Sequence, residues 1–192
     1  MTRPLTPSTP AGRPLQPAPA LAHVPVIETE RLILRAPEAA DLAPLAAFYA
    51  GPRAGFVGGP LDDVGAWRVL ATEIGHWPLR GYGRWTLLRR DSGAVAGLIG
   101  LIDPPGWPEP ELGWDLFEGH EGQGLAFEAA SAVREWTYAT LGWSTLISLI
   151  APDNARSAAL ARRLGARIDG SFTHARHGRL DIWRHPGPEA AP

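Results

Sequence analysis

Two glycines at the start of a helical pattern are the residues of this sequence best placed to do chemistry. Gly122 and Gly124 stand in the run Glu121-Gly-Gln-Gly-Leu-Ala126, between a strand-like segment and a long amphipathic pattern. The first N–H groups of a helix lack partners within the helix, and glycine lets a ligand approach the backbone closely. Together they could bind a phosphate, which the helix dipole also favours. A flexible turn explains the same glycines, so that alternative stays open.

The glycine spacing separates this run from two common nucleotide-binding motifs. The sequence contains no Gly-Lys-Ser or Gly-Lys-Thr, which a Walker phosphate loop requires. The glycine spacing and the late position in the chain also differ from those of a Rossmann fingerprint. Neither nucleotide-binding class is therefore supported.

A second group of polar residues follows the next strand-like segment. Asn154 is the only asparagine of the sequence, and Ser157 lies three residues later. This spacing is about one helical turn, so the two side chains would share a face. The alternative is that Asp153 or Asn154 simply caps the following helix.

Two carboxylates occupy alternate positions in the strand-like segment that precedes the glycines. Glu111 and Asp115 alternate with Leu112, Trp114 and Leu116. Because successive side chains of a strand point to opposite faces, both carboxylates would lie on one face. His120 falls in the loop after this strand, where a surface role is the simpler interpretation.

Composition favours one globular domain and excludes several classes of site. The chain has 192 residues, 45% of them hydrophobic, and a net charge of -2. It offers no basic footprint for nucleic acid or for an anionic membrane. Cysteine is absent and the six histidines lack metal-ligand spacing, so we expect no metal site. No apolar run is long enough to span a bilayer and no signal peptide is evident, so we expect a cytoplasmic protein with no membrane partner.

The elements that would position these residues form a mixed α/β pattern around one sheet. Residues 1–24 are rich in Pro and Ala and predict a disordered tail, 25–186 a single domain, and 187–192 a flexible tail. Gly51 to Pro60 predicts a loop, and a helix that starts after Asp62 would bury Trp67, Leu70 and Ile74. The expected strands are 26–35, 84–90, 94–103, 111–117, 145–151, 166–172 and 179–183, and the other expected helices are 38–49, 122–141 and 154–164.

Several motifs in this order resemble the acetyl-CoA-binding core of the GNAT acetyltransferase superfamily. They are Glu111-Leu-Gly-Trp-Asp-Leu116, the run from His120 to Ala129, and Asn154-x-x-Ser157 with Leu164-Gly165. The segment Thr29 to Arg35 also resembles the first strand of the RimJ and RimL branch. The resemblance implies an α/β (α+β) fold with one mixed, mostly antiparallel sheet. That sheet would have six or seven strands, would splay between strands 4 and 5, and would be flanked by about four helices.

The resemblance also implies which residues bind acetyl-CoA. The pantetheine arm would pair with the backbone of Leu116, Phe117 and Glu118. The pyrophosphate would bind the amides of Gly122, Gln123, Gly124, Leu125 and Ala126, while Asn154 and Ser157 would reach the pantetheine and the thiol. One departure stands out, because Glu121 occupies a position at which the family has Arg or Gln. A carboxylate near the pyrophosphate would weaken its binding.

For catalysis, the resemblance implies an acetyl-CoA-dependent N-acetyltransferase in which the acceptor amine attacks the thioester. Glu111 is the preferred base, directly or through water, unless it is an ordinary exposed strand-end carboxylate. Many relatives have a tyrosine acid seven residues after the asparagine, but that position is Ala161, so Ser157 or solvent would serve the thiolate.

The acceptor is a primary amine, either a protein N-terminus or a small molecule, and the protein would be a monomer or a homodimer. Residues expected on the acceptor side are Arg53, Phe56, His76, Trp77, Tyr82, Arg84 and Trp107. Two alternatives remain: an acyl-CoA sensor with little activity, and an α/β interaction domain without a cofactor.

Overall fold

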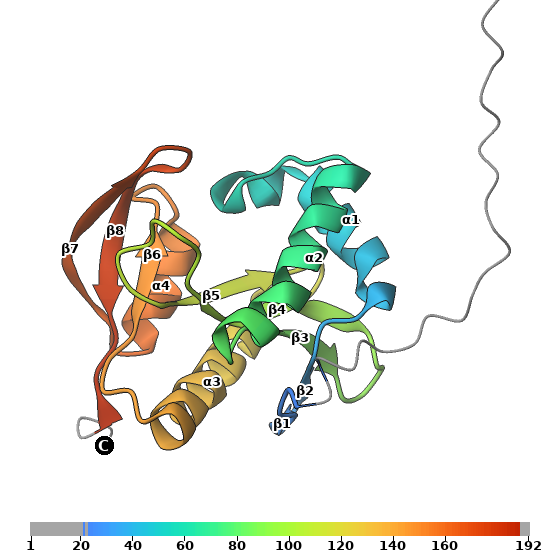
Figure 1. The fold of residues 1–192 in the computed structure, drawn as a ribbon, viewed down its shortest axis with the longest axis horizontal. Coiled ribbons are helices and arrows are strands. Elements are labelled where there is room, and N and C mark those ends of the chain that lie inside the picture. Colours follow the sequence, from blue (N-terminus) through green and yellow to red (C-terminus); the bar gives the residue numbers. More distant parts are fainter. Residues whose placement is uncertain (1–20, 22, 189–192) are drawn as a thin grey trace, which may run out of the picture.

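Eight strands form one sheet in the order β1-β2-β3-β4-β5-β6-β8-β7 (Figure 1). The structure is a computed structural model that describes residue 21 and residues 23–188. All neighbouring strands are antiparallel except β5 and β6, which are parallel. The strands are β1 (Ile27–Glu28), β2 (Leu32–Arg35), β3 (Arg84–Arg89), β4 (Val95–Ile102), β5 (Glu111–Leu116), β6 (Ile147–Ile150), β7 (Arg167–His174) and β8 (Gly178–Arg184).

The segment expected as one strand at 26–35 is a small hairpin, which raises the strand number from seven to eight. The Thr29 amide donates to the carbonyl of Leu32 at 3.0 Å, and the Leu32 amide donates to the Thr29 hydroxyl at 3.1 Å. These two bonds close a turn between β1 and β2. With this hairpin included, the sheet is still mixed and mostly antiparallel, as expected.

The sheet opens into a fork between β5 and β6, which are the predicted fourth and fifth strands. These strands pair only at Glu111 and Ile147. Beyond that point the facing edges of both strands have no strand partner among the described residues. The Ser148 and Glu111 side chains bind the Leu112 carbonyl and the Leu149 amide, and other backbone groups of these edges can bind a ligand. The predicted splay is therefore confirmed.

Four α-helices cover the sheet in the described part of the chain. They are α1 (Leu42–Ala50), α2 (Asp63–Arg80), α3 (Leu125–Leu141) and α4 (Ala155–Arg163). Helices α1 and α2 lie on one side of the central strands and α3 lies on the other side (Figure 1). Helix α3 begins three residues later than expected, so the glycine run precedes the helix. Two short 3-10 helices, η2 (Ala39–Asp41) and η3 (Pro52–Val57), flank α1, and η3 occupies the segment expected as a loop.

Helix α2 begins as predicted but buries a different face. Asp62 caps it by accepting a hydrogen bond from the Gly65 amide at 2.8 Å, and Leu70 is buried. The expectation for Trp67 is wrong, because 57% of its surface is exposed. The buried stripe follows Ala66, Leu70, Glu73 and Trp77, and position 67 is rotated about 100° from Ala66.

Most of the predicted N-terminal tail and residues 189–192 lie outside the described residues. Of the described residues of that tail, Leu21 and Val24 pack against the main hydrophobic core. Among the described helices, none combines the length and the apolar character needed to cross a membrane.

Candidate functional site

Two hollows meet at the fork between β5 and β6. The larger cleft has a volume of about 1020 Å³, and the inner cavity has a volume of about 240 Å³. Trp114, Asp115, Asn154 and Ser157 contribute to the walls of both. Two groups bound in the two hollows would therefore meet beside these side chains.

The glycine run forms part of the wall of the larger cleft. Gly122 and Gly124 have φ angles of 71° and 80°, in the left-handed region that favours glycine. A Cβ at Gly122 would meet no atom within 4 Å, so the space beside the loop is open. Gly124, Leu125 and Ala126 continue the wall into the first turn of α3. The loop has the open backbone and helix start that a phosphate group requires.

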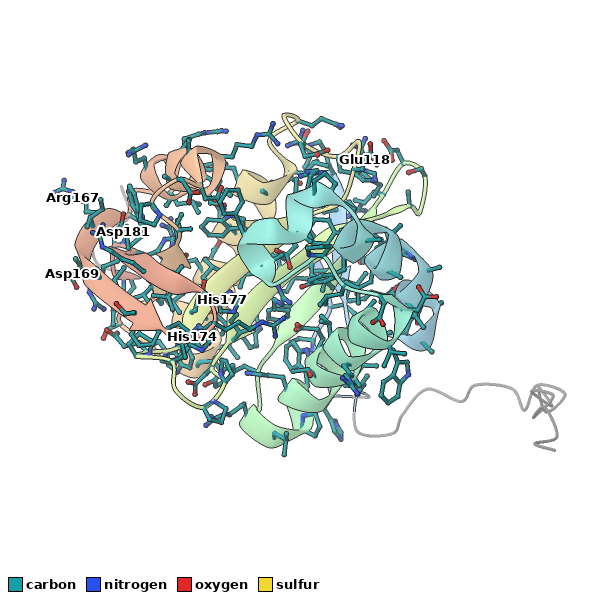
Figure 2. All side chains as sticks on the ribbon, turned by 90° about the horizontal axis from the view of Figure 1, so that it is seen from above. Glu118, Arg167, Asp169, His174, His177 and Asp181 are labelled. Atoms are coloured by element: carbon teal, nitrogen blue, oxygen red, sulfur yellow. The ribbon has the colours of Figure 1, made fainter. Side chains whose placement is uncertain are left out.

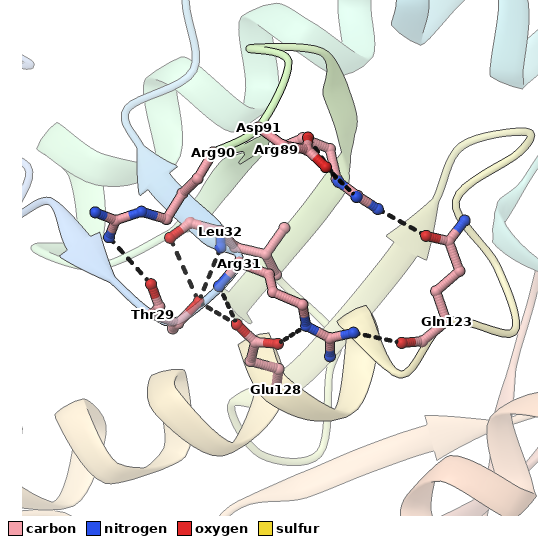
Figure 3. Close-up of polar contacts among 8 residues, drawn as sticks. All are labelled: Thr29, Arg31, Leu32, Arg89, Arg90, Asp91, Gln123 and Glu128. Atoms are coloured by element: carbon pink, nitrogen blue, oxygen red, sulfur yellow. Dashed lines mark hydrogen bonds and ion pairs between the residues drawn. The ribbon is translucent and has the colours of Figure 1, made fainter.

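The loop is held from outside by a polar network, which Figure 3 shows. The guanidinium of Arg31 donates to the carbonyl of Gln123 at 2.8 Å, and Glu128 on α3 accepts from the same guanidinium at 2.6 Å. The side chain of Gln123 accepts from Arg89 at 2.6 Å and donates to the Gly119 carbonyl at 2.8 Å. The side chain and the carbonyl of Gln123 thus anchor the loop, and its backbone amide remains for a ligand.

The three residues expected to pair with pantetheine occupy different environments. Leu116 lines the larger cleft. Phe117 is buried against Phe48, with ring centroids 5.1 Å apart, and its amide donates to the Ala96 carbonyl at 2.9 Å. Glu118 is exposed in the loop after β5, and Figure 2 shows it far from His174 and His177. Because backbone groups alternate along a strand, those of Trp114 and Leu116 face the fork.

Asn154 and Ser157 meet at the start of α4, where the expected cap and the expected shared face are both present. The Asn154 side-chain oxygen accepts from the Ser157 amide at 3.2 Å. The Ser157 hydroxyl oxygen accepts from the indole N–H of Trp114, also at 3.2 Å. No described residue accepts the hydroxyl proton of Ser157, so the hydroxyl can donate it to a ligand.

Glu111 lies in the inner cavity at the closed end of the fork. Only 7% of its surface is exposed, so the alternative of an ordinary exposed carboxylate is wrong. Its two oxygens accept from the Trp107 indole at 2.6 Å and from the Leu149 amide at 3.0 Å. Burial raises the pKa of Glu111 to about 7, and both hydrogen bonds act in the opposite direction. A carboxyl group with this pKa can exchange a proton near neutral pH.

A buried ionic cluster forms another wall of the inner cavity. Arg84 donates to Glu73 on α2 at 3.0 Å and to Asp115 at 2.7 Å. The two carboxylates raise the pKa of Arg84 despite its burial, so the guanidinium remains charged. Burial raises the pKa of Asp115, and Arg84 opposes that effect. Buried Tyr49 lines the same cavity.

The acceptor-side residues expected from the sequence are only partly brought together. Phe56, His76, Arg84 and Trp107 line the inner cavity, whereas Arg53 lines the larger cleft. The expectation that Trp77 and Tyr82 lie on the acceptor side is wrong, because neither lines a hollow. Trp77 packs in the core, and the Tyr82 hydroxyl donates to Asp103 at 3.2 Å.

Tyr49, Glu73 and His177 complete the cavity but carried no sequence motif. His177 and His174 lie together where β7 turns into β8 (Figure 2), with ring centroids 4.9 Å apart. Burial, aided by the charges of His174 and Arg176, lowers the pKa of His177. His120 lies in the loop after β5 and lines neither hollow. Within the described residues, no three His, Asp or Glu side chains are grouped so that they could hold a metal ion.

The sequence of this chain is similar to that of known acetyltransferases. Residues 31–167 match a family described as "Acetyltransferase (GNAT) domain". The chain is 27% identical over 163 residues to "Uncharacterized N-acetyltransferase p20" from Bacillus licheniformis, covering 81% of this chain and 91% of the relative.

Solved structures share the fold. A crystal structure of an acetyltransferase from Agrobacterium tumefaciens str. C58 has a TM-score of 0.78 and 38% identity, covering 91% of this chain and 99% of the other. The microcin C7 self immunity acetyltransferase MccE, solved in complex with acetyl-CoA and AMP, has a TM-score of 0.66 over 82% of this chain and 93% of its own. At 12% identity, the latter likeness concerns the fold alone.

Proposed function

This chain belongs to the GNAT acetyltransferase family, and we propose that it transfers an acetyl group from acetyl-CoA to a primary amine. The observation that carries the proposal is the fork at Glu111 and Ile147. It joins a large cleft with an open glycine loop to a small cavity with a buried carboxyl group. The cleft suits a nucleotide with a pantetheine arm, and the cavity suits the amine. The sequence motifs favour the RimJ and RimL branch of the family.

The residues at the fork could perform each proton movement of a direct transfer. As the amine nitrogen forms its bond to the acetyl carbon, Glu111 takes the amine proton directly or through water. The carbon–sulfur bond breaks, and the thiolate accepts a hydrogen bond from the Ser157 hydroxyl. Solvent completes its protonation, because a serine hydroxyl is a weak acid at neutral pH. With a pKa of about 7, Glu111 is about half ionised at pH 7.

The charges of the inner cavity favour a cationic acceptor. Glu73, Asp115 and ionised Glu111 carry three negative charges against the single positive charge of Arg84. A protonated amine would be attracted and would release one proton to water to expose its lone pair, and the second proton would pass to Glu111 as the nitrogen attacks. Phe56 and Trp107 add aromatic surface for the group that carries the amine. A small-molecule amine and the first residue of a protein both have this chemistry.

Thermal unfolding tests cofactor binding independently of turnover. Acetyl-CoA at about 100 times its dissociation constant should stabilise the protein by roughly 2.7 kcal/mol in thermal unfolding. Gly122→Val should abolish that stabilisation by filling the open space beside the loop. Gly142→Val is the matched control, because Gly142 at the other end of α3 has a similar φ of 69°, open space beside it and no part in either hollow. Both variants carry the same backbone penalty, but only Gly122→Val should lose the ligand effect.

Release of free CoA in the presence of a panel of amines then tests the transfer itself. An enzyme should release CoA faster with at least one primary amine than with none. Stabilisation by acetyl-CoA without release for any amine would favour the sensor alternative. The sensor alternative is based on Ala161, which is fully buried at a position where many relatives have a tyrosine acid. No stabilisation by acetyl-CoA would overturn both cofactor interpretations.

A further inference from the structure

The glycine loop carries a negative charge where its ligand would bring more. Glu121 opens the loop and lines the larger cleft, at a position where the resembling family has Arg or Gln. A carboxylate beside a pyrophosphate repels it, most strongly where water is partly excluded. In this chain, however, Glu121 forms an ion pair with Arg53, which comes from η3 on the far side of the cleft. Arg53 of η3 thus brings a positive charge to the glycine loop, which has no basic residue of its own at position 121.

Among the described residues, Glu121 is the acidic partner of Arg53, and the pair leaves the arginine partly exposed. The Arg53 side chain is 31% exposed, and its buried Nη1 atom contacts the Glu121 carboxylate without a hydrogen bond of normal geometry. Burial, followed by the positive charge of Arg156, lowers the pKa of Arg53, while Glu118 opposes that effect. The ion pair with Glu121 is therefore a contact between charges that another anion could replace.

Three arginines and three carboxylates line the larger cleft, but one of the carboxylates is already paired with an arginine outside the cleft. Arg53, Arg156 and Arg163 line it from η3 and α4, and they face Glu121 and Asp153. Asp115 also lines the cleft but is bound to Arg84. Two arginines from separate elements that repel one another across a cleft are stabilised by an anion placed between them. A phosphate, with several oxygens, suits the planar guanidinium better than a single carboxylate does.

We propose that Arg53 is a phosphate-binding residue of the acetyl-CoA site, supplied by η3 in place of the basic residue that the loop lacks. Glu121 is then a competitor of the phosphate: it pairs with Arg53 in the free protein and gives up that partner to the ligand. This role rests on the proposed function, because acetyl-CoA provides the phosphates.

The test compares acetyl-CoA affinities by isothermal titration calorimetry. Arg53→Met should weaken acetyl-CoA binding about tenfold or more, since it removes a charge-assisted contact and exposes the phosphates to Glu121. Glu121→Gln should hold or strengthen binding, since it frees Arg53. The double variant should bind more tightly than Arg53→Met alone. Arg167→Met removes an exposed arginine on β7 that lines neither hollow and lies far from Glu118 (Figure 2), so it should match the wild type.

A second ligand distinguishes a phosphate contact from a structural role. S-acetylpantetheine carries the thioester arm without the nucleotide phosphates, so Arg53→Met should bind it as the wild type does. Equal losses for both ligands, or similar losses in Arg53→Met and Glu121→Gln, would mean that the pair only holds η3 in place and would overturn the proposal. An Arg53→Met variant that binds acetyl-CoA as tightly as the wild type would overturn this proposal alone. Wild-type protein that binds no acetyl-CoA would remove the proposed function as well.

Discussion

Replacing the carboxyl group of Glu111 with an amide should change how stability depends on pH. In the folded protein the pKa of Glu111 is raised from 4.5 to about 7 by burial. Glu111→Gln keeps the shape of the side chain but removes the titration. A carboxyl group with a raised folded pKa stabilises the protein fully below its unfolded pKa and loses that contribution as the pH rises through the folded value.

The expected magnitude follows from the two pKa values. A difference of one pKa unit corresponds to about 1.4 kcal/mol, so the change from 4.5 to about 7 corresponds to roughly 3 kcal/mol. The free energy of unfolding of the wild type, relative to Glu111→Gln, should therefore fall by roughly 3 kcal/mol between pH 4 and pH 8. Chemical denaturation at several pH values measures this difference directly.

An exposed glutamate provides the control for this measurement, and one outcome would contradict the raised pKa. Glu135 is an exposed glutamate on α3, so Glu135→Gln should follow the wild type across the whole range. Activity should depend on the ionisation of the same carboxyl group. The kcat/KM of the wild type should rise with pH towards a plateau above pH 7, and Glu111→Gln should lose most of this kcat/KM. A stability difference that stays constant from pH 4 to pH 8 would refute the raised pKa, and with it the choice of Glu111 as base.

Three further substitutions test neighbouring groups. Trp107→Phe removes the donor that favours the ionised form of Glu111, so the pH at which kcat/KM reaches half its plateau should move upwards; an unchanged pH profile would contradict that contact's effect. Ser157→Ala should lower kcat several-fold with little change in the affinity for acetyl-CoA, and a kcat within about twofold of the wild type would end its proposed role. Arg84→Met leaves Glu73 and Asp115 buried without their cation, so thermal or chemical denaturation should show a loss of about 3 to 5 kcal/mol; a loss below about 1 kcal/mol would mean that the cluster contributes little.

The parts of the fold that the sequence predicted are those governed by local rules. Asp62 caps α2 because a short acidic side chain reaches the amide three residues on, and Gly142 ends α3 in the left-handed conformation. Local patterns also located the strands around the fork. The turn between β1 and β2 was missed because it depends on the Thr29 side chain, and Trp67 was misplaced because several faces of α2 carry apolar residues.

The site was less predictable, because its properties depend on contacts between distant segments. The alternation of residues placed Glu111 on the correct strand face. Its raised pKa, however, results from burial between distant segments, and it is opposed by hydrogen bonds from Trp107 in the preceding loop and Leu149 in β6, which no local pattern connects. The same is true of Arg53 and Glu121, which are 68 residues apart in the sequence. The glycine loop could be recognised from its sequence, but the cation beside it could not.

The short helix η3 has a consequence for how the two proposed ligands affect each other's binding. Phe56 and Val57 line both the larger cleft and the inner cavity, so one segment forms part of two binding sites. A ligand that fixes η3 in one site also fixes the wall of the other, and the second ligand then loses less conformational entropy. Thermodynamic linkage makes this effect reciprocal: the factor by which acetyl-CoA changes the affinity for the acceptor equals the factor by which the acceptor changes that for acetyl-CoA.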